Sequence, residues 1–198
     1  MSMFISQHLA MYDKNEQTME KDEEQWYVMR AYKNETKAEK HLSGKYGLKH
    51  FIPKEQAMRT CNGKKVICTV PVIHSLVFVY AAHKQIVAFK KEIYNDLQFV
   101  IWKHKHNDNT HYLTVPNDQM NNFIGVCEQK EKEVTFYRPD QINIEKGKKV
   151  RVHGGTFDKL EGIYVKVAKK RNKQFVVIIP EILAASTTVD PEYLEIIN

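Results

Sequence analysis

The sequence predicts an α+β fold, in which an N-terminal α/β sandwich with a mainly antiparallel sheet precedes a small C-terminal all-β barrel. Three observations indicate this. Strand-like runs of aromatic and branched residues alternate with amphipathic helical stretches over residues 25–127. Residues 128–141 are charged and lack a core pattern, so we expect a linker there. Residues 142–198 hold short strand-like runs separated by turn residues.

Composition sets broad limits on the function. The 198 residues carry a net charge of +6, which permits a polyanionic partner without requiring one. The first 24 residues have a net charge of −4, and we expect them to be an acidic, flexible leader, with a short amphipathic segment over residues 3–11 as the alternative. Three cysteines and the lack of an apolar run of about 18 residues favour a reduced cytoplasmic protein without a membrane partner.

The first half of the sandwich is predicted from three features. Trp26–Tyr32 is apolar on both faces, as in a central strand, and a helix with a capping box follows over residues 34–46. Asn62-Gly63 separates two strand-like runs and predicts a two-residue hairpin turn, because both residues tolerate positive φ. The apolar run Leu76–Tyr80 predicts a further buried strand.

The second half is predicted to contain two helices and two strands. A helical stripe spans residues 84–94. Strands at residues 98–102 and 111–115 are joined by a polar turn, and a helix runs from Pro116 to near Val126.

The C-terminal segment carries the most specific pattern. An alternating strand at Lys148–Val152 leads into a glycine-containing turn and then a second strand at Gly162–Val167. This pattern resembles the KOW motif of NusG-type transcription factors and several ribosomal proteins. Such a motif implies a small barrel that binds RNA or protein.

The sequence from about residue 25 to residue 198, which includes this motif, resembles the NusG family. Residues 25–127 would be its N-terminal (NGN) domain and residues 142–198 its KOW domain. The segments that carry the resemblance are Trp26–Tyr32, Pro53, Val72–Val79, Val115–Phe123 and Thr188–Glu195.

One segment departs from the family pattern. The chain has His74-Ser75-Leu76 where family members usually have Pro-Gly-Tyr. Specialised paralogues, such as RfaH and the UpxY-type antiterminators of capsular polysaccharide operons, vary here more than the general factor does. The resemblance therefore implies an operon-specific regulator.

The resemblance implies binding rather than catalysis. A monomer would bind the clamp region of RNA polymerase through its N-terminal domain and promote readthrough of terminators. The candidate polymerase-binding residues are Tyr32, Lys37, His41, His74, Leu76 and Phe78. We expect no enzymatic activity, metal or cofactor, because no catalytic motif is present.

Basic and apolar residues suggest further partners. Non-template DNA or nascent RNA would contact two basic groups, and a ribosomal protein or another factor would contact two apolar residues of the KOW motif. The candidates for nucleic acid are Lys103, His104, Lys105, His106, Lys169, Lys170 and Arg171. The candidates for the protein partner are Phe157 and Leu160.

Two alternatives remain open at this stage. The chain could be a general RNA-binding or ribosome-associated KOW protein that makes no polymerase contact. It could also be a histidine-dependent nuclease that uses residues 104–111, although no acidic helix or cysteine pair with ligand spacing accompanies these histidines.

Overall fold

The computed structural model describes residues 23–32, 35–44, 46–92, 96–103, 110–129, 132–168 and 170–197. These residues form a mixed α/β structure whose strand pairings are antiparallel. The predicted leader lies outside the described residues except for its last two positions. No helix within the described ranges is long and apolar enough to cross a membrane.

The N-terminal sheet is built around β1 (Gln25–Ala31), which confirms the predicted central strand. β5 (Leu76–Ala81) and β6 (Leu97–Phe99) lie on either side of β1. β2 (Lys49–Phe51) pairs with the outer edge of β5, and β9 (Thr114–Val115) also pairs with β1. Both faces of β1 and β5 are buried, which explains their nearly continuous apolar sequences.

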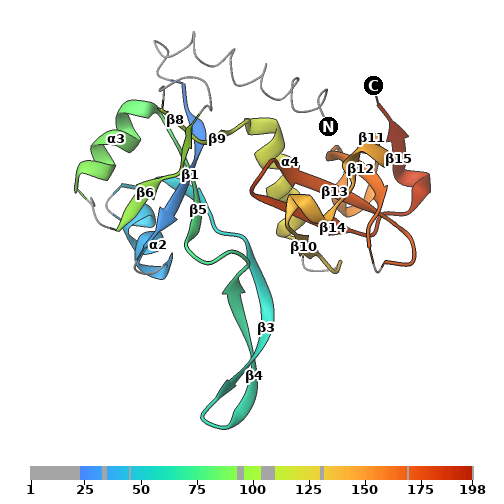
Figure 1. The fold of residues 1–198 in the computed structure, drawn as a ribbon, viewed down its shortest axis with the longest axis horizontal. Coiled ribbons are helices and arrows are strands. Elements are labelled where there is room, and N and C mark those ends of the chain that lie inside the picture. Colours follow the sequence, from blue (N-terminus) through green and yellow to red (C-terminus); the bar gives the residue numbers. More distant parts are fainter. Residues whose placement is uncertain are drawn as a thin grey trace.

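Helices cover both faces of this sheet. α2 (Glu35–Ser43) and α3 (His83–Glu92) pack on one face and α4 (Asn117–Cys127) packs on the other (Figure 1). The alternation of side chains along β1 divides the core between these faces. Tyr27 and Met29 belong to the cluster with α2 and α3, whereas Trp26 and Val28 belong to the cluster with α4.

The C-terminal sheet has six strands in the order β10-β14-β13-β12-β11-β15. Its longest strand is β13, which lies near the centre of the sheet. The strands are β10 (Thr135–Tyr137), β11 (Lys148–Val152), β12 (Glu161–Lys166), β13 (Lys173–Ile179), β14 (Leu183–Thr187) and β15 (Leu194–Ile196). Single-turn 3-10 segments lie between them at Pro139–Gln141, Ile144–Lys146, Gly155–Phe157 and Pro191–Tyr193.

β10 is a difference from the sequence-based prediction. It lies inside residues 128–141, where the composition suggested an irregular linker, and it pairs with β14. Its three residues are too short to produce a recognisable strand pattern, and the pairing with a distant strand decides their conformation.

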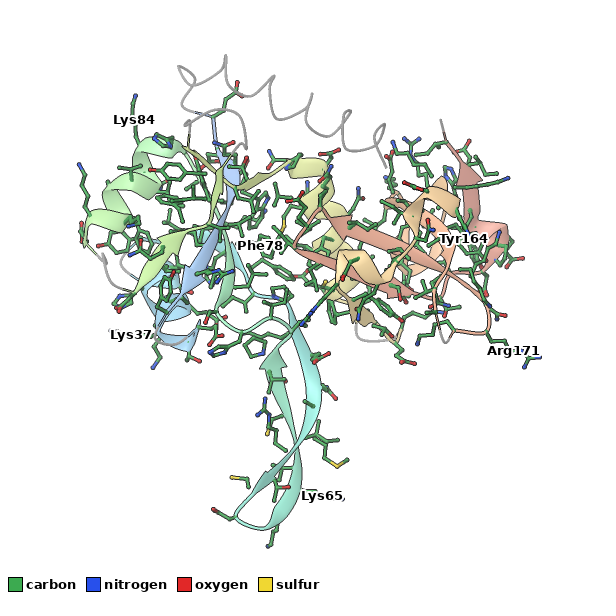
Figure 2. The ribbon with its side chains drawn as sticks, in the orientation of Figure 1. Lys37, Lys65, Phe78, Lys84, Tyr164 and Arg171 are labelled. Carbon is green, nitrogen blue, oxygen red and sulfur yellow. The ribbon has the colours of Figure 1, made fainter. Side chains whose placement is uncertain are left out.

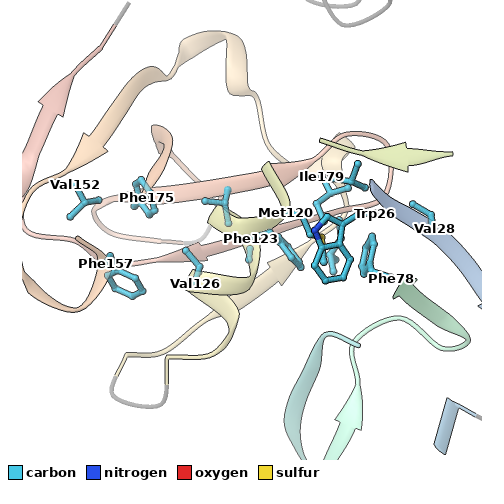
Figure 3. Packing of buried hydrophobic residues seen from close by; sticks show 14 of the residues in the cluster. Trp26, Val28, Phe78, Met120, Phe123, Val126, Val152, Phe157, Phe175 and Ile179 are labelled. Carbon is cyan, nitrogen blue, oxygen red and sulfur yellow. The ribbon is translucent and has the colours of Figure 1, made fainter. Parts of the chain in front are cut away.

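α4 joins the two sheets into one core. Its side chains Met120, Phe123 and Val126 are fully buried. The same cluster contains Trp26 and Phe78 of the N-terminal sheet and seven residues of the C-terminal strands (Figure 3). Those seven residues are Val150, Val152, Phe175, Val177, Ile179, Leu183 and Ala185. Burying an apolar side chain of this size stabilises a fold by about 1.5–3 kcal/mol, so the contact of α4 with both sheets is a major source of stability.

Two hairpins lie outside the two large sheets. β3 (Lys54–Cys61) and β4 (Lys64–Pro71) form a two-stranded ribbon that projects from the rest of the chain (Figure 1). Asn62 and Gly63 have φ angles of 50° and 76°, which confirms the predicted turn. β7 (Ile101–Lys103) and β8 (Thr110–Tyr112) form the second ribbon, so each strand predicted near residues 98–102 and 111–115 is divided into two short ones.

Candidate interaction surface

One end of the N-terminal sheet brings several predicted site residues together. β1 ends where β5 and β6 begin, because both strands run antiparallel to it. The residues that flank these ends therefore meet. Ala31 N–H donates to the Ser75 carbonyl at 2.8 Å, and Tyr32 N–H donates to the Asp96 carbonyl at 3.2 Å. The Tyr32 side chain is directed outward and is 64% exposed.

Two basic residues of α2 approach Asp96. Lys37 and His41 are four positions apart and so lie on the same side of the helix. Lys37 Nζ lies 2.8 Å from Asp96 Oδ2, and His41 Nε2 lies 3.8 Å from the same oxygen. The Asp96 side chain is mostly buried, whereas Lys37 is half exposed. Asp96 therefore connects the start of β6 to the outer side of α2.

The loop before β5 is held by Glu35 at the start of α2. His74 Nδ1 lies 2.9 Å from Glu35 Oε1, and the Ser75 N–H donates to the same oxygen. The His74 side chain nevertheless remains 87% exposed. We call this assembly the sheet-end surface, and it consists of Tyr32, Glu35, Lys37, His41, His74 and Asp96.

Ser75 has a backbone conformation that is unusual for a residue with a side chain. Its φ angle is 68°, in the left-handed region that favours glycine. In the resemblance described above, Ser75 stands at the glycine of the Pro-Gly-Tyr pattern. Hydrogen bonding of the Ser75 N–H to Glu35 helps to hold the serine in this conformation.

Leu76 and Phe78 lie apart from the sheet-end surface. Both are buried on the sheet face that packs against α4. The Phe78 ring centroid lies 6.4 Å from that of Phe123 in α4 (Figure 3). In this arrangement the two residues stabilise the core, and a partner could reach them only if α4 moved.

The structure describes only part of the predicted nucleic-acid site. The Lys103 side chain and all of His104, Lys105, His106 and Lys169 lie outside the described residues. Lys170 Nζ lies 3.6 Å from Glu133 Oε1, and Arg171 is exposed at the turn before β13 (Figure 2). Within the described ranges, no group of three or more potential metal ligands is present.

Phe157 and Leu160, the predicted protein-binding pair of the C-terminal segment, contact the chain itself. Phe157 is buried, with its ring centroid 6.5 Å from that of Phe175. Leu160 packs onto α4 at Gly125, where an added Cβ would lie 2.9 Å from both terminal carbons of the leucine. Gly125 therefore allows the C-terminal strands to approach the helix closely.

Hydrogen bonds flank this contact. The Glu161 N–H donates to Asn122 Oδ1 at 2.9 Å, and Gln129 Nε2 donates to the Thr156 carbonyl at 3.2 Å. These bonds fix the register between α4 and the strand that follows Leu160.

An ion pair holds β11 against β12. Arg151 Nε donates to Glu161 Oε1 at 3.0 Å, and Lys149 Nζ lies 3.5 Å from the other carboxylate oxygen. The hydrogen bond from Arg151 is the main cause that lowers the pKa of Glu161, and the charge of Lys149 lowers it further.

Burial raises the pKa of the Cys127 thiol at the end of α4, because the thiolate would lose its hydration.

Sequence reasoning missed Glu35, Asp96 and Gly125. Glu35 and Asp96 act only because distant loops meet at the end of the sheet, so no local pattern marks them. Gly125 does carry a signal. A glycine inside an amphipathic helix lowers helix stability by about 0.5–1 kcal/mol and suggests a close packing contact.

Comparison with known proteins identifies the family. The sequence pattern of the NusG family, described as "Transcription termination factor nusG", matches residues 24–124, just over half of the chain. A solved structure described as "Domain interaction in Thermotoga maritima NusG" is 17% identical, with a TM-score of 0.40, and the alignment covers 89% of this chain and 98% of that chain. No curated protein sequence matches. The match over residues 24–124 shows that the chain belongs to the NusG family, and this membership indicates a role in transcription elongation.

Proposed function

We propose that this protein binds RNA polymerase through the sheet-end surface and promotes transcription through pause and termination sites. The family match over residues 24–124 is the observation that carries the proposal. The sheet-end surface lies within those residues and combines an exposed aromatic ring with exposed basic groups. Tyrosine is a frequent energetic centre of protein interfaces because it offers a large, rigid contact area.

The proposed mechanism is a shift in the conformational equilibrium of the polymerase. A factor that binds the elongating, closed-clamp state more tightly than the paused state raises the population of the former. Tyr32 and His74 would supply the main contacts, and Lys37 and His41 would lie at the rim. Leu76 and Phe78 would support this surface from the core, because both are buried.

The proposed function is also specific to particular operons. Residues 74–76 differ from the family's usual Pro-Gly-Tyr, which supports an operon-specific antiterminator, such as those of capsular polysaccharide operons. The C-terminal sheet would act as a KOW domain that contacts RNA, a ribosomal protein or another factor. Lys170 and Arg171 are candidates for such a contact, since both lie at the turn before β13.

Binding to polymerase without nucleic acid tests the first step. Tyr32→Ala should weaken binding to core RNA polymerase by at least about tenfold, because truncation of a central interface tyrosine typically has an effect of this size. Tyr193→Ala is the matched control, since Tyr193 is also an exposed tyrosine but lies in the C-terminal region. Equal binding by the two variants would contradict the sheet-end assignment.

A transcription assay tests the second step. Purified protein should raise the fraction of transcripts that pass a terminator, and Tyr32→Ala should lose this effect. Should the protein bind RNA but show neither polymerase binding nor readthrough, the alternative of a general RNA-binding protein would replace the proposal.

A further inference from the structure

The β3–β4 ribbon is highly exposed. Its strands pair only with each other, and none of residues 54–71 is buried. A two-stranded hairpin gains little stability from its own pairing, so folding alone gives no reason for its length. The base is anchored by Lys54 Nζ, which lies 3.1 Å from Glu39 of α2.

The ribbon is strongly basic. It contains four basic residues and one acidic residue, which gives a net charge of +3 over 18 residues. By their register, Arg59, Lys64 and Lys65 lie in the half of the ribbon nearer the turn. Figure 2 shows Lys65 there, far from the base. All three are exposed, and no ion pair is found for them in the part of the chain that the structure describes.

Two apolar side chains lie among these charges. Met58 and Ile67 are cross-strand partners and so share one face of the ribbon. Their exposed fractions are 67% and 69%, values that are high for large apolar residues. Lys65 lies on the same face, whereas Arg59 and Lys64 lie on the opposite face, so the ribbon carries cations on both faces and the apolar pair on one.

We propose that the β3–β4 ribbon binds double-stranded DNA by entering the major groove. Two paired strands lie about 4.8 Å apart, and the major groove of B-form DNA is about 12 Å wide and admits such a ribbon. Arg59, Lys64 and Lys65 contact phosphates along the groove walls, and Met58 and Ile67 contact thymine methyl groups on its floor.

The composition of the ribbon favours this ligand over other nucleic acids. Single strands are bound mainly by stacking bases on aromatic rings, and residues 54–71 contain no aromatic residue. The major groove of A-form RNA is too narrow and deep for side chains to read. The DNA contact is also independent of the proposed polymerase contact, because it uses different residues and needs no polymerase.

Binding of the full-length chain to a 20-base-pair DNA duplex tests the proposal. Fluorescence anisotropy over a range of salt concentrations measures both the affinity and its salt dependence. Each phosphate contact contributes about 0.9 to the slope of log K against log salt. The triple variant R59A/K64A/K65A should therefore lower the magnitude of that slope by about 2.7 and weaken binding by more than about tenfold.

A matched variant controls for net charge. K40A/K91A/K146A also removes three exposed positive charges but leaves the ribbon intact. It should change the affinity less than threefold. Equal losses in the two triple variants would show non-specific attraction to the whole chain and would overturn the proposal, as would the absence of duplex binding by the unaltered protein at low salt.

The apolar pair has a separate test. M58S/I67S removes both apolar side chains from this exposed face and should weaken duplex binding without changing the salt slope. Replacing thymine by deoxyuridine in the duplex removes the methyl groups, so it should weaken binding of the unaltered protein but not of M58S/I67S. If both proteins respond equally to deoxyuridine, the groove assignment is wrong.

Two further ligands complete the experiment. Tighter binding to the corresponding single strand or to duplex RNA would overturn the choice of B-form DNA.

If R59A/K64A/K65A weakens binding to core polymerase and leaves duplex binding unchanged, the ribbon is a protein-binding arm instead. The Tyr32→Ala polymerase assay is read separately, so either proposal can fail without the other.

Discussion

α4 and the β3–β4 ribbon show opposite uses of apolar residues. α4 places Met120, Phe123 and Val126 between two sheets, where all three are fully buried. The ribbon places Met58 and Ile67 in solvent, without a neighbouring layer. Hydrophobic residues in α4 therefore stabilise the fold, whereas those in the ribbon contribute little to it and are available for a partner.

Truncation at the centre of α4 should have the largest effect on stability. Phe123 lies 6.3 Å from Phe51 and 6.4 Å from Phe78 between ring centroids. Phe123→Ala should reduce the free energy of unfolding by about 3–5 kcal/mol, because it leaves a cavity in the shared core. Urea denaturation followed by circular dichroism measures this. A loss below about 1 kcal/mol would contradict the central role of α4.

Adding a side chain at Gly125, where α4 contacts Leu160, should have an intermediate effect on stability. Gly125→Val should destabilise the chain by about 1–3 kcal/mol, since its side chain would overlap Leu160. Thermal unfolding measures the change. In a Leu160→Ala background the overlap is relieved, so Gly125→Val should there destabilise the chain less. A double-mutant cycle of Gly125→Val and Leu160→Ala without coupling would show that the contact does not form in solution.

The Arg151–Glu161 pair should have a small, pH-dependent effect. The pKa of Glu161 is lowered in the folded chain, so the pair stabilises the fold at pH values above the ordinary carboxyl pKa. This stabilisation is lost as the pH falls from the ordinary carboxyl pKa through the lower pKa of the folded chain. Glu161→Gln should lower the free energy of unfolding at pH 7 by less than about 1 kcal/mol, because the pair is partly exposed.

Measuring unfolding at several pH values checks the sign of this effect. The difference between Glu161→Gln and the unaltered chain should shrink as the solution becomes acidic. A difference that grows in acid would show that Glu161 stabilises the fold by another route.

Truncation in the ribbon should have the smallest effect. Met58→Ala should change the free energy of unfolding by no more than about 0.5 kcal/mol, because the side chain is exposed and touches no layer of the fold. Urea denaturation beside Phe123→Ala makes the comparison direct. Similar losses in the two variants would mean that the ribbon packs on the body of the protein.

Strong local patterns in the sequence predicted most of the fold. The central strand, the Asn62-Gly63 turn and the helix after Pro116 each follow from a dense apolar run, a turn pair or a periodic stripe. β10 was not predictable, because its conformation depends on pairing with β14, about 50 residues later in the sequence. The apolar pattern also could not show that α4 has a sheet on each side.

The sequence predicted the surface less completely than the fold. Tyr32, Lys37, His41 and His74 were selected through the family resemblance, and the structure brings them to one end of the sheet. Leu76 and Phe78 were selected with them, although they point toward α4. Adjacent positions along a strand face opposite sides, and sequence alone does not show which side a helix covers.

β10 also shortens the tether between the two halves of the protein. Only residues 128–134 separate the end of α4 from the first strand of the C-terminal sheet. Seven residues span at most about 25 Å when fully extended. If the C-terminal sheet detached from α4, the short tether would keep it at a high local concentration, of the order of millimolar, beside the surface it had left. A partner that competes for either surface would therefore have to bind more strongly than the tethered C-terminal sheet rebinds to α4.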